Sequence, residues 1–260
     1  MAPDKLIQPT GFRSRFLAGE PLLGTFIKTP TSHGIEIVGG AGFDFVVIDE
    51  EHAPFDRVTI DTCLLAARAV GTAGIVRVAE PTAAKLLSVL DDGAAGVLVP
   101  HVSSVAAAKA VVSACRYRSG RRGFSNSPRA GGYGALGLWD HVDKADAEVT
   151  IIAMIEDPEA LDVVDRIVAV DGLDGVFVGR GDLTVAMKAD GMASPQVRAA
   201  AEKIIAAAKA AGKPSCVMVS GNQEAESFRK LGASAFIVGS EQNFMRQTAL
   251  KVRAEFPHGN

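Results

Sequence analysis

Two carboxylates at corresponding places in the chain are the first residues whose chemistry stands out. Glu156 directly follows the apolar run 150–155, and Asp182 lies just after a second apolar run, 175–179. Both runs have the length and β-branched content of buried parallel strands, and functional groups collect at the carboxyl ends of such strands. Two acids at neighbouring strand ends could hold one hard divalent cation such as Mg2+ or Mn2+. Each acid alone would more often serve a helix start, so the metal-binding interpretation depends on the pair.

Other strand ends contribute a candidate base and a permanent cation. Asp49 and His52 close the second predicted strand, and an aspartate that orients an imidazole makes it a better general base near neutral pH. On its own, His52 before Ala-Pro would more often cap a helix. Arg77 lies within the third strand, where a buried guanidinium needs a partner, and it could hold the keto or enolate oxygen of a substrate. Four further residues lie at the predicted mouth: Lys28, Glu50, His101 and Arg180.

These groups together suit a 2-oxo acid as substrate. Glu156 and Asp182 would leave about four positions of an octahedral cation open to water or substrate. A 2-oxo acid can fill two of them with its carboxylate and keto oxygen, and the metal then polarises the carbonyl and stabilises the enolate produced by C–C cleavage. Backbone N–H groups of Gly181 and Asp182, at the start of a helix, could bind the substrate carboxylate.

Eight apolar segments have the pattern of strands that must position these side chains. They cover residues 22–28, 43–49, 74–78, 96–101, 150–155, 175–179, 214–219 and 235–239, and a helical segment follows each one. This spacing of βα units, without a break in composition, predicts a (β/α)8 TIM barrel formed by one domain, residues 1–260. A doubly wound open sheet is the competing architecture. The glycine- and arginine-rich segment 117–139 predicts a long irregular loop with a functional or interface role.

The composition excludes several classes of partner and location. The chain has 260 residues, 48% of them hydrophobic, and a net charge of -3, so nothing favours nucleic acid or an anionic membrane as partner. No apolar run approaches the roughly 20 residues of a membrane span, and the start lacks a signal-peptide pattern. Cys63, Cys115 and Cys216 lack CxxC spacing, which favours buried thiols over a zinc site or disulfides. We therefore expect a soluble cytoplasmic protein.

Taken together, the motifs resemble the HpcH/HpaI aldolase family, the class II pyruvate-type aldolases that act on 4-hydroxy-2-oxo acids. In chain order they are Ile-Asp-Glu-Glu-His-Ala-Pro at 48–54, Val-Arg at 76–77, Leu-Val-Pro at 98–100, Arg-Gly at 122–123, Ile-Glu at 155–156 and Gly-Val-Phe-Val-Gly-x-x-Asp-Leu at 175–183. Three positions depart from the family pattern. Glu50 stands where a small residue is usual, Met154 where glutamine is frequent, and Arg180 where proline is usual.

The resemblance implies a barrel whose last helix is exchanged with a neighbouring subunit, in a homo-hexamer. It also implies a divalent metal, Mg2+, Mn2+ or Co2+, on Glu156 and Asp182, a base formed by His52 with Asp49, and an enolate stabilised by Arg77.

The resulting hypothesis is the reversible cleavage of a 4-hydroxy-2-oxo acid to pyruvate, or hydroxypyruvate, and an aldehyde. Two alternatives stay open: a citrate-lyase-β-like or malyl-CoA-type thioester lyase, and a non-catalytic barrel that binds an oxo acid. A Schiff-base mechanism is disfavoured because the fifth and sixth predicted strands contain no lysine.

Overall fold

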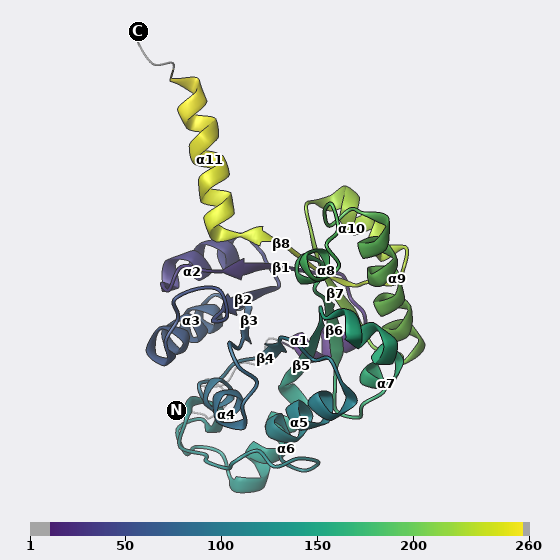
Figure 1. The fold of residues 1–260 in the computed structure, drawn as a ribbon. Helices are drawn as coiled ribbons and strands as arrows, with labels where there is room; N and C mark the ends of the chain where they lie inside the picture. Colours follow the sequence, from purple (N-terminus) through teal and green to yellow (C-terminus); the bar gives the residue numbers. More distant parts are fainter. Residues whose placement is uncertain (1–10, 257–260) are drawn as a thin grey trace.

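The strands predicted from the sequence close into one parallel barrel (Figure 1). The computed structural model describes residues 11–256. Its strands pair in chain order and the eighth pairs back to the first, which an open sheet would not do, so the predicted (β/α)8 barrel is confirmed. The strands are β1 (Leu22–Ile27), β2 (Phe45–Asp49), β3 (Ala73–Arg77), β4 (Gly96–Val99), β5 (Thr150–Ile155), β6 (Gly175–Val178), β7 (Ser215–Val219) and β8 (Ala235–Ser240).

Helices alternate with the strands and surround them, as Figure 1 shows. The α-helices are α1 (Phe12–Leu17), α2 (Ser32–Gly40), α3 (Arg57–Ala69), α4 (Ala83–Asp91), α5 (Val105–Cys115), α6 (Leu138–Glu148), α7 (Val164–Val168), α8 (Arg180–Ala186), α9 (Pro195–Ala210), α10 (Asn222–Arg229) and α11 (Glu241–Glu255). Two 3-10 turns, η2 (Arg129–Gly131) and η3 (Pro158–Val163), precede α6 and α7. The helix α6 was not predicted from the sequence, and it buries a narrow face of His141, Val142 and Ala145.

The hydrophobic core has two layers, as the alternation of side chains along each strand requires. One layer fills the space between the strands and the helices. The other fills the barrel interior, where α1 closes the amino-terminal end: the Phe12 ring lies 5.2 Å from the Phe45 ring, and Phe16 is fully buried. Nearer the other end, Phe26 and Phe177 meet edge to face at 6.4 Å. The barrel is therefore a packed core with one end free to carry a site.

The long segment 117–139 is held against two helices of the barrel. Arg122 bonds Asp91 at the end of α4 at 2.9 Å, and Arg129 bonds Asp61 in α3 at 2.7 Å. The cavity at the barrel mouth, described below, has no lining residue from this segment. Its arginines thus anchor it to the outside of the barrel.

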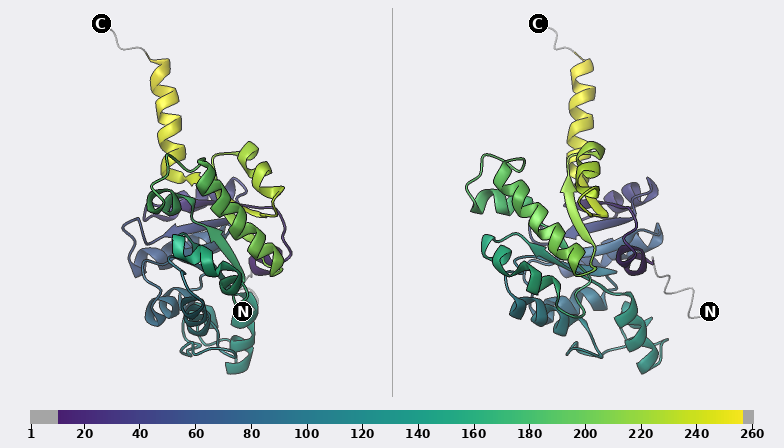
Figure 2. Two further views of the ribbon diagram at one scale, coloured as in Figure 1. Left: turned by 45° about the vertical axis from the view of Figure 1, so that its right-hand side comes forward. Right: turned by 90° about the vertical axis from the view of Figure 1, so that its right-hand side faces the viewer.

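The last helix, α11, projects away from the barrel in all three views of Figures 1 and 2. None of its side chains is buried in the described chain. Its amino-terminal residue is nevertheless fixed, because both Glu241 carboxylate oxygens accept the Lys28 backbone N–H, at 2.9 and 3.0 Å. Within residues 11–256, no helix combines the length and apolar character that a membrane crossing requires.

Candidate active site

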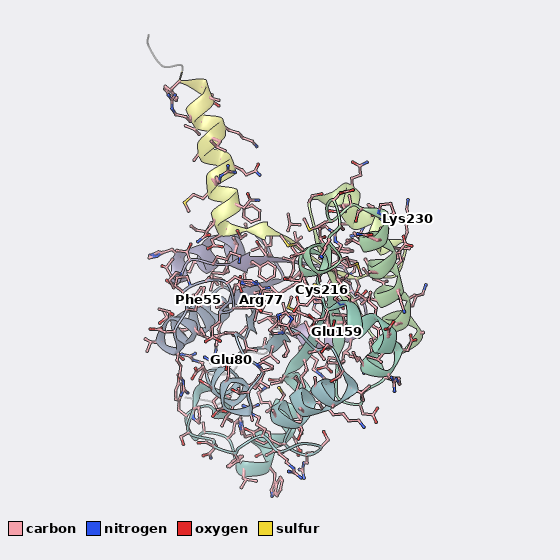
Figure 3. All side chains as sticks on the ribbon, in the orientation of Figure 1. Phe55, Arg77, Glu80, Glu159, Cys216 and Lys230 are labelled. Atoms are coloured by element: carbon pink, nitrogen blue, oxygen red, sulfur yellow. The ribbon has the colours of Figure 1, made fainter. Side chains whose placement is uncertain are left out.

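The predicted site residues gather at the carboxyl end of the barrel because the strands run in register. Asp49 pairs with Arg77 across β2 and β3, and Ile155 pairs with Val178 across β5 and β6. A cavity of about 320 Å³ opens there. Its lining includes five residues singled out from the sequence, namely Lys28, Arg77, Arg180, Gly181 and Asp182. Figure 3 shows Arg77 inside the ring of helices and Lys230 on its outer side.

A buried ion pair between Asp49 and Arg77 forms one side of the site. The Asp49 side chain is fully buried, and its two oxygens accept Nε–H and Nη2–H of Arg77, both at 2.8 Å. The Lys28 ammonium donates to the same carboxylate. Burial alone would raise the pKa of Asp49, but the bonds and charges of Arg77 and Lys28 outweigh it and hold the pKa below its ordinary value. The guanidinium also lies 4.8 Å from the centre of the Phe26 ring. Arg77 is therefore fixed in position, with the partner that its burial requires.

His52 lies beside this pair, but its imidazole has a different neighbour from the expected one. Asp49 Oδ1 accepts the backbone N–H of His52 at 3.2 Å, and the exposed imidazole places Nε2 3.6 Å from Glu51 Oε2. The same Glu51 oxygen lies 3.2 Å from Arg77 Nη1. Asp49 thus positions the main chain of His52, and Glu51 links its ring to Arg77. The sequence analysis did not assign a role to Glu51, although its place between Glu50 and His52 was a signal.

Glu156 and Asp182 lie at the ends of the neighbouring strands β5 and β6. Glu156 is 2% exposed, and its Oε1 accepts the backbone N–H of His101 at 2.8 Å. Burial raises the pKa of Glu156 to about 7, and the negative charge of Asp182 adds to the shift. Asp182 is exposed, and within residues 11–256 its side chain has no hydrogen-bond partner. The charge of Asp182 thus acts on the buried Glu156 carboxylate from the neighbouring strand end.

This pair fits a divalent cation. A cation would relieve the repulsion between the two carboxylates and the cost of ionising the buried one. The absence of a side chain at Gly179 leaves room for Glu156. A Cβ at that position would come within 2.8 Å of Glu156 Oε2. Within the described chain, no three His, Cys, Asp or Glu side chains converge as a metal site. The protein would therefore supply two hard oxygen ligands and leave the remaining positions to water or substrate.

Of the other predicted mouth residues, His101 lies at the site and Glu50 bonds to the surrounding protein. His101 stands at the rim: its φ of 53° directs its N–H to Glu156, and its Nδ1 lies 3.1 Å from Asp157 Oδ1. Burial opposes protonation of His101, but the Asp157 hydrogen bond and the charge of Glu156 raise its pKa. Glu50 turns away from the mouth, because its carboxylate pairs with Lys85.

The first turn of α8 carries the predicted mouth residue Arg180 and the predicted carboxylate-binding residue Gly181. Arg180 is buried and bonds Glu224 and the backbone oxygen of Met218. Gly181 is exposed, and nothing lies within 4 Å of the place that a Cβ would take. The main chain around Gly181 is therefore open to the cavity, as a carboxylate-binding role requires, whereas the Arg180 side chain is committed to the protein.

The fold and the site are those of a (β/α)8-barrel enzyme. Two acids, a buried arginine and a histidine lie at the carboxyl end of the barrel, where such enzymes carry their active sites. A family model described as HpcH/HpaI aldolase/citrate lyase matches residues 22–248. A 5-keto-4-deoxy-D-glucarate aldolase from Enterobacter sp. (strain 638) is 36% identical, with 96% of this chain and 98% of that protein covered. The chain belongs to the HpcH/HpaI aldolase/citrate lyase family, as the sequence motifs implied, and is an enzyme of the lyase type.

Solved structures agree with this assignment. A HpcH/HpaI aldolase/citrate lyase family protein from Burkholderia cenocepacia J2315 superposes with a TM-score of 0.89 at 26% identity, covering 95% of this chain and 98% of that one. The citrate synthase SbnG superposes with a TM-score of 0.85 at 28% identity, covering 94% and 96%. The family supports metal-dependent aldolase chemistry on 2-oxo acids.

Proposed function

We propose that this protein reversibly cleaves a 4-hydroxy-2-oxo acid to pyruvate, or hydroxypyruvate, and an aldehyde. The observation that supports the proposal is that Asp182 and Arg77 line one cavity, and that Glu156, at the end of the neighbouring strand β5, lies within the influence of the Asp182 charge. The 5-keto-4-deoxy-D-glucarate aldolases among the relatives support a 2-oxo acid substrate.

Glu156 and Asp182 would hold Mg2+, Mn2+ or Co2+. When bound, the cation supplies Lewis-acid polarisation of the keto group of the substrate. The backbone N–H groups of Gly181 and Asp182, in the first turn of α8, would bind the substrate carboxylate.

His52 is the proposed general base. Its exposed imidazole takes the proton of the C4 hydroxyl through a water molecule, the C3–C4 bond breaks, and the aldehyde leaves. The electron pair of the broken bond passes to C3 and onto the keto oxygen as an enolate. Arg77 donates two of its five N–H groups to Asp49, and its Nη1 lies 3.2 Å from Glu51, so N–H groups remain on the guanidinium for this oxygen. Return of a proton to C3 completes the 2-oxo acid product.

Lys28 has no nucleophilic role in this proposal, because its ammonium is paired with Asp49. Borohydride reduction in the presence of pyruvate should therefore leave the protein mass unchanged. A covalent adduct on Lys28 would establish a Schiff-base mechanism instead.

We further propose that α11 packs on a neighbouring subunit of a homo-hexamer. Large apolar side chains remain exposed along it, among them Met245, Leu250 and Val252. A lone helix that exposes apolar residues gains stability by packing against another chain.

We also propose a cytoplasmic location for the protein. The three buried cysteines of the described chain are all free thiols, as is usual in a reducing compartment.

The direct test is aldol cleavage with added Mg2+, Mn2+ or Co2+. Alanine at Glu156 or at Asp182 should abolish metal-dependent cleavage, and activity of the double variant in excess EDTA would refute the proposal. Turnover of acyl-CoA substrates but not of free oxo acids would assign a thioester lyase instead. A barrel that merely binds an oxo acid would decarboxylate oxaloacetate with none of the metals.

A further inference from the structure

Asp182 is the less constrained of the two proposed metal ligands. Glu156 is buried and fixed by the His101 N–H, whereas Asp182 is exposed and unbonded within the described chain. Its position therefore depends on the turn that joins β6 to α8. That turn has backbone bonds at 3.0 Å from Gly179 N to Ile155 O and at 3.1 Å from Leu183 N to Gly179 O. One side chain in the turn adds a connection to the next strand.

That side chain is Arg180, two residues before Asp182. It is 7% exposed, and it donates from Nη1 to Glu224 Oε1 at 2.7 Å and from Nη2 to Met218 O at 2.6 Å. Its guanidinium carbon lies 4.9 Å from the centre of the Phe228 ring. Arg180 thus connects the end of β6 to the end of β7 and to α10.

Glu224 continues this connection to the end of β7. Its Oε2 accepts the Ser220 backbone N–H at 2.7 Å and the Ser220 hydroxyl at 2.9 Å. Since one carboxylate bonds Arg180 on one oxygen and Ser220 on the other, the two strand ends are tied by charge-assisted hydrogen bonds. The Asp182-bearing turn therefore has a fixed place relative to β7.

We propose that Arg180 is a positioning residue that raises the affinity of the metal site by fixing the turn that carries Asp182. This inference rests on the proposed function, in which Glu156 and Asp182 hold the cation. Positioning residues of metal ligands typically contribute about 10- to 100-fold to metal affinity. Arg180 acts through the main chain, so the lower end, about tenfold, is expected.

The sign of the effect separates positioning from simple electrostatics. Arg180 carries a positive charge near the site, and removing a positive charge by itself favours the binding of a cation. Replacement by Met, which keeps the length and packing of the side chain, should therefore tighten Mn2+ binding if charge dominates. It should weaken Mn2+ binding about tenfold if positioning dominates.

The chain offers a matched control in Arg198. Its guanidinium also lies 4.9 Å from the Phe228 ring centre, and its Nε bonds Glu202 at 2.7 Å on the surface of α9. Arg198→Met removes the same charge from the same ring, without touching the turn.

The experiment measures Mn2+ affinity by calorimetry in the absence of substrate, with unfolding of the metal-free protein followed alongside. Arg180→Met should raise the dissociation constant for Mn2+ about tenfold, and Arg198→Met should leave it unchanged. The double variant Arg180→Met/Glu224→Gln should bind no more weakly than Arg180→Met, since the two side chains act through one contact.

Three results would overturn the inference: unchanged or tighter Mn2+ binding by Arg180→Met, an equal loss in Arg198→Met, or additive losses in the double variant. Asp182→Asn separates failure of the inference from failure of the proposed function. If Asp182→Asn binds Mn2+ as the wild type does, the metal site itself is wrong. If Asp182→Asn loses binding and Arg180→Met does not, the positioning role alone is wrong.

Discussion

Asp49→Asn should destabilise the protein strongly, because it breaks the buried ion pair at the base of the site. The carboxamide removes the charge that faces Arg77 and Lys28, and its NH2 group must meet a donor. Breaking a buried pair from one side typically costs about 3–5 kcal/mol. Two features reduce this cost: Arg77 keeps Glu51 at 3.2 Å, and the Lys28 side chain is 28% exposed. We expect a loss of about 2–4 kcal/mol, which lowers the Tm of a chain of this length by about 4–7 °C.

The loss should also depend on pH. The pKa of Asp49 lies below its ordinary value of 3.8, so its stabilising contribution is complete above that value and disappears as pH falls through the folded-state pKa. The variant should therefore show a shallower decline of stability in acid. Its kcat/KM should fall about 100-fold or more, because Arg77 and the main chain of His52 both lose their anchor.

The assay is urea and thermal unfolding of the metal-free protein in EDTA, which removes the contribution of metal binding. Asp143→Asn is the matched control. Asp143 receives the same two-pronged bond from Arg118, at 2.9 and 3.1 Å, but both side chains are more than half exposed. Exposed pairs contribute about 0–1 kcal/mol. If Asp49→Asn lowers the free energy of unfolding by no more than Asp143→Asn does, the buried pair of Asp49 and Arg77 does not stabilise the site.

Two further predictions follow from particular contacts. Gly179→Ala should weaken Mn2+ binding, because the added Cβ would lie within 2.8 Å of Glu156 Oε2. The control is Gly181→Ala, whose Cβ would meet nothing within 4 Å, and this variant should bind Mn2+ as the wild type does. Equal Mn2+ affinities of the two variants in calorimetry would contradict the close packing of Gly179 against Glu156. His141→Gln should reduce the loss of stability between pH 7 and 5. Burial and the charge of Arg122 lower the pKa of His141 below 6.5 in the folded protein. The unfolded chain therefore takes up the proton first, and the stability of the wild type falls as the pH drops below 6.5. Parallel stability–pH curves for the two proteins would exclude this role.

The sequence predicted the barrel because its strands are buried on both faces and therefore stand out as short apolar runs. The helix α6 was not foreseen, because its buried face is three residues wide and charged residues surround it. The strand ends indicated which residues follow one another around the carboxyl end of the barrel, since parallel strands bring them to one edge.

Individual partners could not be predicted, because they depend on where each side chain turns after the strand ends. Asp49 accepts the backbone N–H of His52, whose ring lies beside Glu51 instead. Arg180 lines the cavity but bonds Glu224. The spacing of residues along the sequence does not show in which direction each of these side chains points.

The central claim is that one cation binds between Glu156 and Asp182. The most direct measurement is an anomalous difference map from crystals grown with Mn2+ and pyruvate. A single strong peak per chain should lie at the barrel mouth, next to one oxygen of each carboxylate and two oxygens of the 2-oxo acid. A peak that contacts neither acid, or just one of them, would show that the two carboxylates do not share a cation.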